Sequence, residues 1–142
     1  MPFTSGLVHN VFILRWDRVK PGDGKKLVEQ VAIARSRVEG EMVYVAITPA
    51  DHEPPGEMER RELAEALQKL LTYCSCVHLV MEGSGFKHAI VRMVAAGVFL
   101  VSGKRGQVSP HDSAADALAS CNHLSRPASQ ILAAAREMKL IT

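Results

Sequence analysis

A Gly-Ser-Gly corner is the first stretch whose composition could carry chemistry. It lies in "VHLVMEGSGFKHAIVRMVAAG", residues 77–97, between a short apolar run and a segment with helical spacing. A serine before a helix is accessible to phosphorylation, and the helix dipole stabilises a phosphate there. Glycines at such a corner can also cradle a nucleotide phosphate, or only permit a tight turn. Gly83, Ser84 and Gly85 therefore have three interpretations: a switch, a nucleotide loop or a turn.

The glycine spacing argues against a nucleotide loop. The phosphate loop requires GxxxxGK[ST], and the dinucleotide fingerprint requires three spaced glycines soon after the first strand. Here two glycines follow the third predicted strand. The switch and the turn remain, and Lys87, His88 and Arg92 add positive charge beside the corner that suits recognition of an anion.

The histidines and cysteines do not form a familiar catalytic or metal-binding motif. The six histidines show no HxH, HxxH or HExxH spacing, and Cys74, Cys76 and Cys121 are an odd number of cysteines without metal-finger spacing. A Ser-His-Asp set built from Ser84, His88 or His111, and Asp112 lacks the GxSxG elbow. We therefore expect no catalytic residues, no metal site and no cofactor, with the cysteines as buried thiols in a reducing compartment.

Hydrophobic periodicity predicts strands that alternate with helices. The predicted strands are residues 11–16, 42–47, 77–81 and 107–110; the predicted helices are residues 26–37, 58–73 and 86–102, one capped by Ser113, and a last one capped by Ser125. The order β-α-β-α-β-α-β-α plus a C-terminal helix predicts an α/β fold, with a small, mostly parallel sheet under helical cover. We expect one domain over residues 1–121 and a helical extension of it over residues 122–142.

This order of elements resembles the STAS domain, the fold of bacterial anti-sigma factor antagonists and of the cytoplasmic end of sulfate transporters. The resemblance covers residues 8–121 by element order. The segment from Glu82 to Phe86 is also similar to an E-G-x-G-F segment of uncharacterised bacterial STAS-like proteins. In that family a regulatory Ser or Thr precedes a helix. The resemblance implies a bacterial signalling protein that works through protein contacts, with Ser84 as its switch.

The predicted helix over residues 86–102 is apolar nearly all round. Its polar side chains, Lys87, His88 and Arg92, lie near its beginning. Such a helix must be covered on two sides, either by the last helix of the chain or by a partner, which could be a second copy.

Charge and composition exclude several classes of protein. A net charge of +2 and 5% aromatic residues do not suit nucleic-acid binding, and the longest apolar run is too short to span a bilayer. The N-terminal residues lack a basic region and a cleavage site, so we expect no secretion signal and a cytoplasmic location.

The sequence thus predicts a non-enzymatic regulatory or assembly protein. Its alternative is a small-molecule or anion sensor that uses the same helix N-terminus. The expected interaction residues are Gly83, Ser84, Gly85, Phe86, Lys87, His88 and Arg92.

Overall fold

A five-stranded, mostly parallel sheet forms the centre of the protein. The computed structural model describes residues 3–17, 20–49, 57–82 and 108–141. The strands lie side by side in chain order: β1 (Phe3–Val8), β2 (Val11–Trp16), β3 (Val43–Thr48), β4 (Cys76–Met81) and β5 (Val108–His111). β1 pairs with β2 in the antiparallel sense, and the pairs β2–β3, β3–β4 and β4–β5 are parallel.

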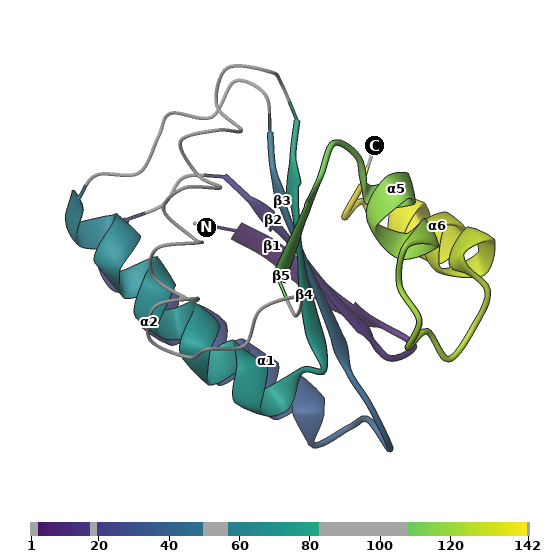
Figure 1. Ribbon diagram of the computed structural model, residues 1–142, viewed down its shortest axis with the longest axis horizontal. Helices are drawn as coiled ribbons and strands as arrows, with labels where there is room; N and C mark the ends of the chain where they lie inside the picture. The colour runs from purple at the N-terminus through teal and green to yellow at the C-terminus, as the bar shows by residue number, and fades with distance from the viewer. Residues whose placement is uncertain (1–2, 18–19, 50–56, 83–107, 142) are drawn as a thin grey trace.

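Among the described residues, two helices cover each face of the sheet, which gives three layers (Figure 1). The helices of one face are α1 (Asp23–Arg35) and α2 (Glu57–Tyr73), and those of the other are α5 (Ala114–Ala119) and α6 (Ala128–Glu137). α1 and α2 share a face because successive right-handed crossovers advance across the sheet in one direction. None of the described helices combines the length and apolar character needed to cross a membrane.

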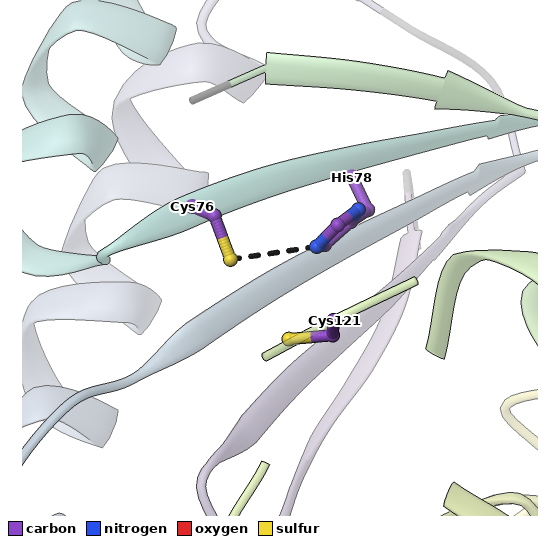
Figure 2. A group of neighbouring side chains, drawn as sticks. All are labelled: Cys76, His78 and Cys121. Atoms are coloured by element: carbon purple, nitrogen blue, oxygen red, sulfur yellow. Dashed lines mark hydrogen bonds between the residues drawn. The ribbon is translucent and has the colours of Figure 1, made fainter. Parts of the chain in front are cut away.

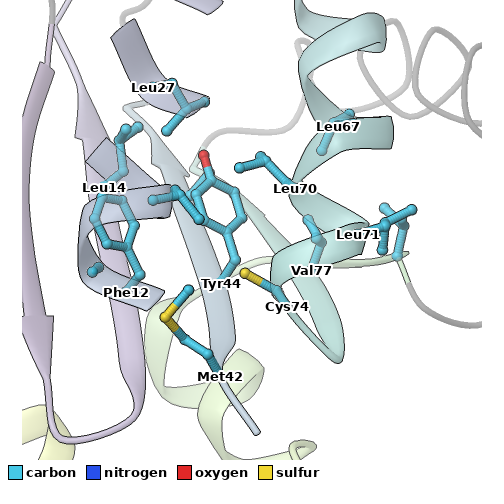
Figure 3. Close-up of a cluster of buried hydrophobic side chains, with 14 of the residues drawn as sticks. Phe12, Leu14, Leu27, Met42, Tyr44, Leu67, Leu70, Leu71, Cys74 and Val77 are labelled. Carbon is cyan, nitrogen blue, oxygen red and sulfur yellow. The ribbon is translucent and has the colours of Figure 1, made fainter. Parts of the chain in front are cut away.

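The core on the α1–α2 face is organised around Tyr44 of β3 (Figure 3). Its ring stacks on Phe12 with centroids 5.9 Å apart, and Leu70 and Cys74 are also buried in this core. No described residue forms a hydrogen bond with the Tyr44 hydroxyl. Burial raises the pKa of Tyr44 and raises the pKa of Cys74 to about 12, because an apolar core disfavours the charged forms.

The structure confirms the α/β class and corrects the element order. The chain begins with two strands rather than one, because β1 folds back on β2 through a two-residue turn in which His9 has a φ of 54°. Residues 3–8 were not predicted to be a strand, because polar and apolar residues are mixed in this edge strand. Ser113 caps α5 as predicted, accepting a hydrogen bond from the Asp116 amide at 3.1 Å. α6 begins at Ala128, with Pro127 rather than Ser125 in the capping position.

We predict that the Tyr44→Phe variant resists alkaline unfolding better than the native protein. The free energy of unfolding should fall as pH rises above about 9, since unfolded Cys74 and Tyr44 ionise near 9.0 and 10.0 while the folded groups keep their protons. Phenylalanine removes the tyrosine contribution, and at pH 7 it should change stability by less than about 1 kcal/mol.

Urea unfolding at pH 7, 9, 10 and 11 measures this difference. Tyr73→Phe, at a partly exposed tyrosine, is the matched control and should follow the native curve. Parallel curves for the Tyr44→Phe variant and the native protein would contradict the assignment.

Candidate functional site

Two cysteines and a histidine meet on the sheet face that α5 and α6 cover (Figure 2). Cys76 and His78 are two residues apart on β4, so both side chains point to the same face. Cys121 comes from the segment between α5 and α6. The Sγ atom of Cys76 lies 3.4 Å from Nε2 of His78, and the ligand atoms of all three residues lie within 4.8 Å of one another. We call these residues the Cys-His-Cys cluster.

The short helix α5 delivers Cys121 to the cluster. Ala117 and Leu118 of this helix are buried against the sheet. After the helix ends, the Cys121 amide donates to the Leu118 carbonyl oxygen at 3.2 Å. The position of the thiol therefore depends on the docking of α5 rather than on any neighbour of Cys121 in sequence.

Asn10 fixes the chain that follows Cys121. From the β1–β2 turn, its side-chain amide donates to the carbonyl oxygens of His123, at 2.6 Å, and of Glu41, at 3.0 Å. Its side-chain oxygen accepts a hydrogen bond from the Ser125 amide at 2.9 Å. His123 also pairs through Nδ1 with the Glu41 carboxylate. One buried asparagine thus joins three segments that are remote in sequence.

The pKa values of the two cysteines in the cluster are shifted in opposite directions. The pKa of Cys121 is lowered because the Cys76 thiol donates a hydrogen bond to it, with further donors in His78 and the backbone N–H of His123. The same hydrogen bond raises the pKa of Cys76, which must keep its proton to donate, and burial raises it further. These shifts favour the thiolate form at Cys121 and the thiol form at Cys76.

A second histidine, His111, contacts the other ring nitrogen of His78. His78 Nδ1 lies 2.9 Å from Nε2 of His111, the last residue of β5, and Ser120 Oγ lies 3.4 Å from the same nitrogen. The register places Val80 beside His111, so His111 shares the face of His78. When Nε2 of His78 carries the ring proton and faces the Cys76 sulfur, Nδ1 accepts from His111; when Nε2 has no proton, Nδ1 can donate to His111 instead.

This arrangement suits a soft or borderline metal ion and also suits thiol oxidation. Thiolate and imidazole are the ligands that Zn²⁺ prefers in proteins. A thiolate in contact with a second thiol is the arrangement from which a disulfide forms. His78 is buried, while Cys76 and Cys121 are partly exposed, so both sulfurs are accessible.

The predicted interaction residues lie outside the described part of the chain. Gly83, Ser84, Gly85, Phe86, Lys87, His88 and Arg92 all fall within residues 83–107. The switch at Ser84 and the covering of the apolar segment over residues 86–102 stay predictions. Of the Ser-His-Asp set, His111 lies against His78, while Ser84 and His88 fall outside the described residues.

A small cavity of about 120 Å³ lies at the carboxyl ends of β2, β3 and β4. Arg15, Glu82 and Arg136 contribute to its wall, and Arg15 pairs with Glu82 at 3.3 Å. This edge of a parallel sheet is where ligands of α/β proteins commonly bind. Glu82, which lines the cavity, is the residue before Gly83 in the sequence, where the sensor alternative predicts an anion-binding site.

The Cys-His-Cys cluster was not predicted from the sequence, although the spacing of two of its three residues can be recognised there. Cys74 is buried in the α1–α2 core and Cys76 packs against the other core, because Cys74 lies before β4, which begins at Cys76, and is not part of the extended strand. The pair that shares a face is Cys76 and His78, a Cys-x-His spacing on a strand. Nothing local connects this pair to Cys121.

Comparison with known proteins found no relative of this chain. No family model, curated protein or solved structure matches this chain. The resemblance to STAS domains therefore stays a prediction, and the function is inferred from the chemistry of the site.

We predict that the Asn10→Ala variant detaches the segment that follows Cys121. It removes three hydrogen bonds made by the buried Asn10 side chain, which should destabilise the protein by about 1–3 kcal/mol. Amide exchange at Ser125 should become faster, since its acceptor is removed. Hydrogen exchange measured by mass spectrometry, together with urea unfolding, tests both effects.

Asn122→Ala is the matched control, because it makes the same change at an exposed residue of the same segment. It should alter stability by no more than about 0.5 kcal/mol. If Ser125 exchanged as slowly in the Asn10→Ala variant as in the native protein, Asn10 would not hold the segment.

Proposed function

We propose that the protein is a non-enzymatic regulatory protein that binds Zn²⁺ through Cys76, His78 and Cys121. The observation that carries this proposal is the convergence of two sulfurs and one imidazole nitrogen within 4.8 Å on one sheet face. Three protein ligands leave a fourth tetrahedral position for water or an exogenous group.

The spacing of the ligand atoms supports tetrahedral coordination. Zinc–sulfur and zinc–nitrogen bonds of about 2.3 and 2.05 Å place a tetrahedral sulfur–nitrogen pair about 3.6 Å apart. The Cys76 Sγ to His78 Nε2 distance is 3.4 Å. A metal ion therefore requires only a small adjustment of these side chains.

The hydrogen bonds around the cluster also prepare it for a cation. The lowered pKa of Cys121 favours an anionic ligand at this position. Binding displaces the Cys76 proton and the Nε2 proton of His78, as metal binding to thiols and imidazoles generally does. His111 can then accept a hydrogen bond from His78 Nδ1, as the outer partners of zinc-binding histidines do.

The position of the cluster suggests how metal binding would regulate the protein. Cys76 and His78 belong to the sheet, whereas Cys121 belongs to the connection between α5 and α6. A metal ion shared by them would join the sheet to the C-terminal helical layer. Metal occupancy would then control how firmly α5 and α6 are docked, and through them the contacts made with a partner protein.

We predict that the reduced protein binds Zn²⁺ and Co²⁺ in a 1:1 complex. Cobalt should give the thiolate charge-transfer band and the intense visible bands of tetrahedral coordination. Zinc at about 100 times its dissociation constant should raise the free energy of unfolding by about 2.7 kcal/mol. Titration by absorbance and calorimetry, with urea unfolding, measures these effects.

The variants Cys76→Ser, His78→Gln and Cys121→Ser should each weaken metal binding by more than about 100-fold. Cys74→Ala is the matched control, because Cys74 is buried on the opposite face of the sheet and should not affect the cobalt spectrum. Absence of binding to the folded, reduced native protein would refute the proposal. So would equal binding by the three variants and the native protein.

A further inference from the structure

The two sulfurs of the Cys-His-Cys cluster form a redox pair as well as a metal site. We propose that a hydroperoxide oxidises Cys121 and that Cys76 then closes a disulfide with it, joining β4 covalently to the α5–α6 connection. The disulfide step requires no metal ion. Its consequence for metal release rests on the proposed zinc function, because the disulfide removes two of the three ligands.

Cys121 is the sulfur suited to react first. It lies in the connection between α5 and α6 rather than in a strand, and the ring of His78 and the Cys76 sulfur are within 4.8 Å of its sulfur. It is partly exposed, so a small peroxide can reach it. Cys74, in contrast, is buried in the apolar core between the sheet and α1–α2. The environments thus separate one reactive sulfur from one inert sulfur.

The first step transfers one oxygen atom to Cys121. The thiolate attacks the outer oxygen of the hydroperoxide, a sulfur–oxygen bond forms and the oxygen–oxygen bond breaks. The departing alkoxide or hydroxide takes a proton from solvent and leaves as an alcohol or as water. The sulfur loses two electrons to the peroxide and becomes a sulfenic acid.

Cys76 is placed to complete the reaction. Its sulfur attacks the sulfur of oxidised Cys121, a sulfur–sulfur bond forms and the sulfur–oxygen bond breaks. The hydroxide that leaves combines with the Cys76 proton as water. The sulfur atoms lie within 4.8 Å of each other before reaction, and a disulfide requires about 2.05 Å. Cys121 lies beyond the end of α5, where a rotation of its side chain does not disturb a regular element.

The structural result is a covalent bond between layers that are otherwise packed through apolar contacts. The bond would link residues 76 and 121, which encloses a long loop, and cross-links over long loops restrict the unfolded chain strongly. The oxidised protein should therefore unfold at a higher urea concentration than the reduced metal-free protein. A thiol reductant should reverse the effect.

The test begins with the reduced, metal-free full chain and stoichiometric hydrogen peroxide. We expect the mass to fall by two hydrogen atoms, peptide mapping to give a Cys76–Cys121 link, and dithiothreitol to restore the original mass. The Cys76→Ser variant should stop at a sulfenic acid that dimedone traps on Cys121. The Cys121→Ser variant should form no disulfide, and Cys74→Ala should behave as the native protein does.

A second experiment with zinc-loaded protein separates the two proposals. Peroxide should release zinc to a chromogenic chelator in step with disulfide formation. A disulfide that forms in a protein unable to bind zinc would support the redox pair and refute the zinc function. Zinc binding without a Cys76–Cys121 disulfide, or with dimedone trapping on Cys74 instead, would overturn the redox pair and leave the zinc function standing.

Discussion

Alternation of side chains along β4 is the constraint on which the rest of the structure depends. β4 lies between β3 and β5, so helices or loops must cover both of its faces. Val77 and Leu79 face the apolar core under α1 and α2. Cys76 and His78 face the other way, toward α5 and α6. One strand therefore supplies both the packing that stabilises the sheet and the polar groups that can do chemistry.

Placing polar groups under a helical layer requires partners for them. His78 has one ring nitrogen toward the sulfurs and the other toward His111, so neither is left without a partner. Asn10 has the same role at the edge of this layer, where it satisfies the backbone of His123 and Ser125. The β1–β2 turn thereby limits how far the connection carrying Cys121 can move. The polar contacts make the docking of the C-terminal helices specific, whereas the apolar contacts supply most of its free energy.

The proposed metal site and the proposed disulfide both depend on the short distance between the sulfur atoms of Cys76 and Cys121. Both join β4 to the connection between α5 and α6, and both need the sulfurs of Cys76 and Cys121. They differ in the part played by His78, which is a ligand in one case and a hydrogen-bond donor in the other. Under the two proposals, metal ions and oxidants would act on the protein through the same two sulfur atoms. Such a response is what we expect of the proposed regulatory protein.

The sequence by itself determined the α/β class and the predicted strands that became β2 to β5. These features follow from hydrophobic periodicity and strand alternation, which are local properties of the chain. Tertiary structure alone decided the antiparallel edge strand β1 and the approach of Cys121 to Cys76 and His78. That approach depends on which sheet face α5 packs against and on the hydrogen bonds of Asn10 across more than 100 residues. No spacing in the sequence encodes it, because contacts between remote segments are set by packing.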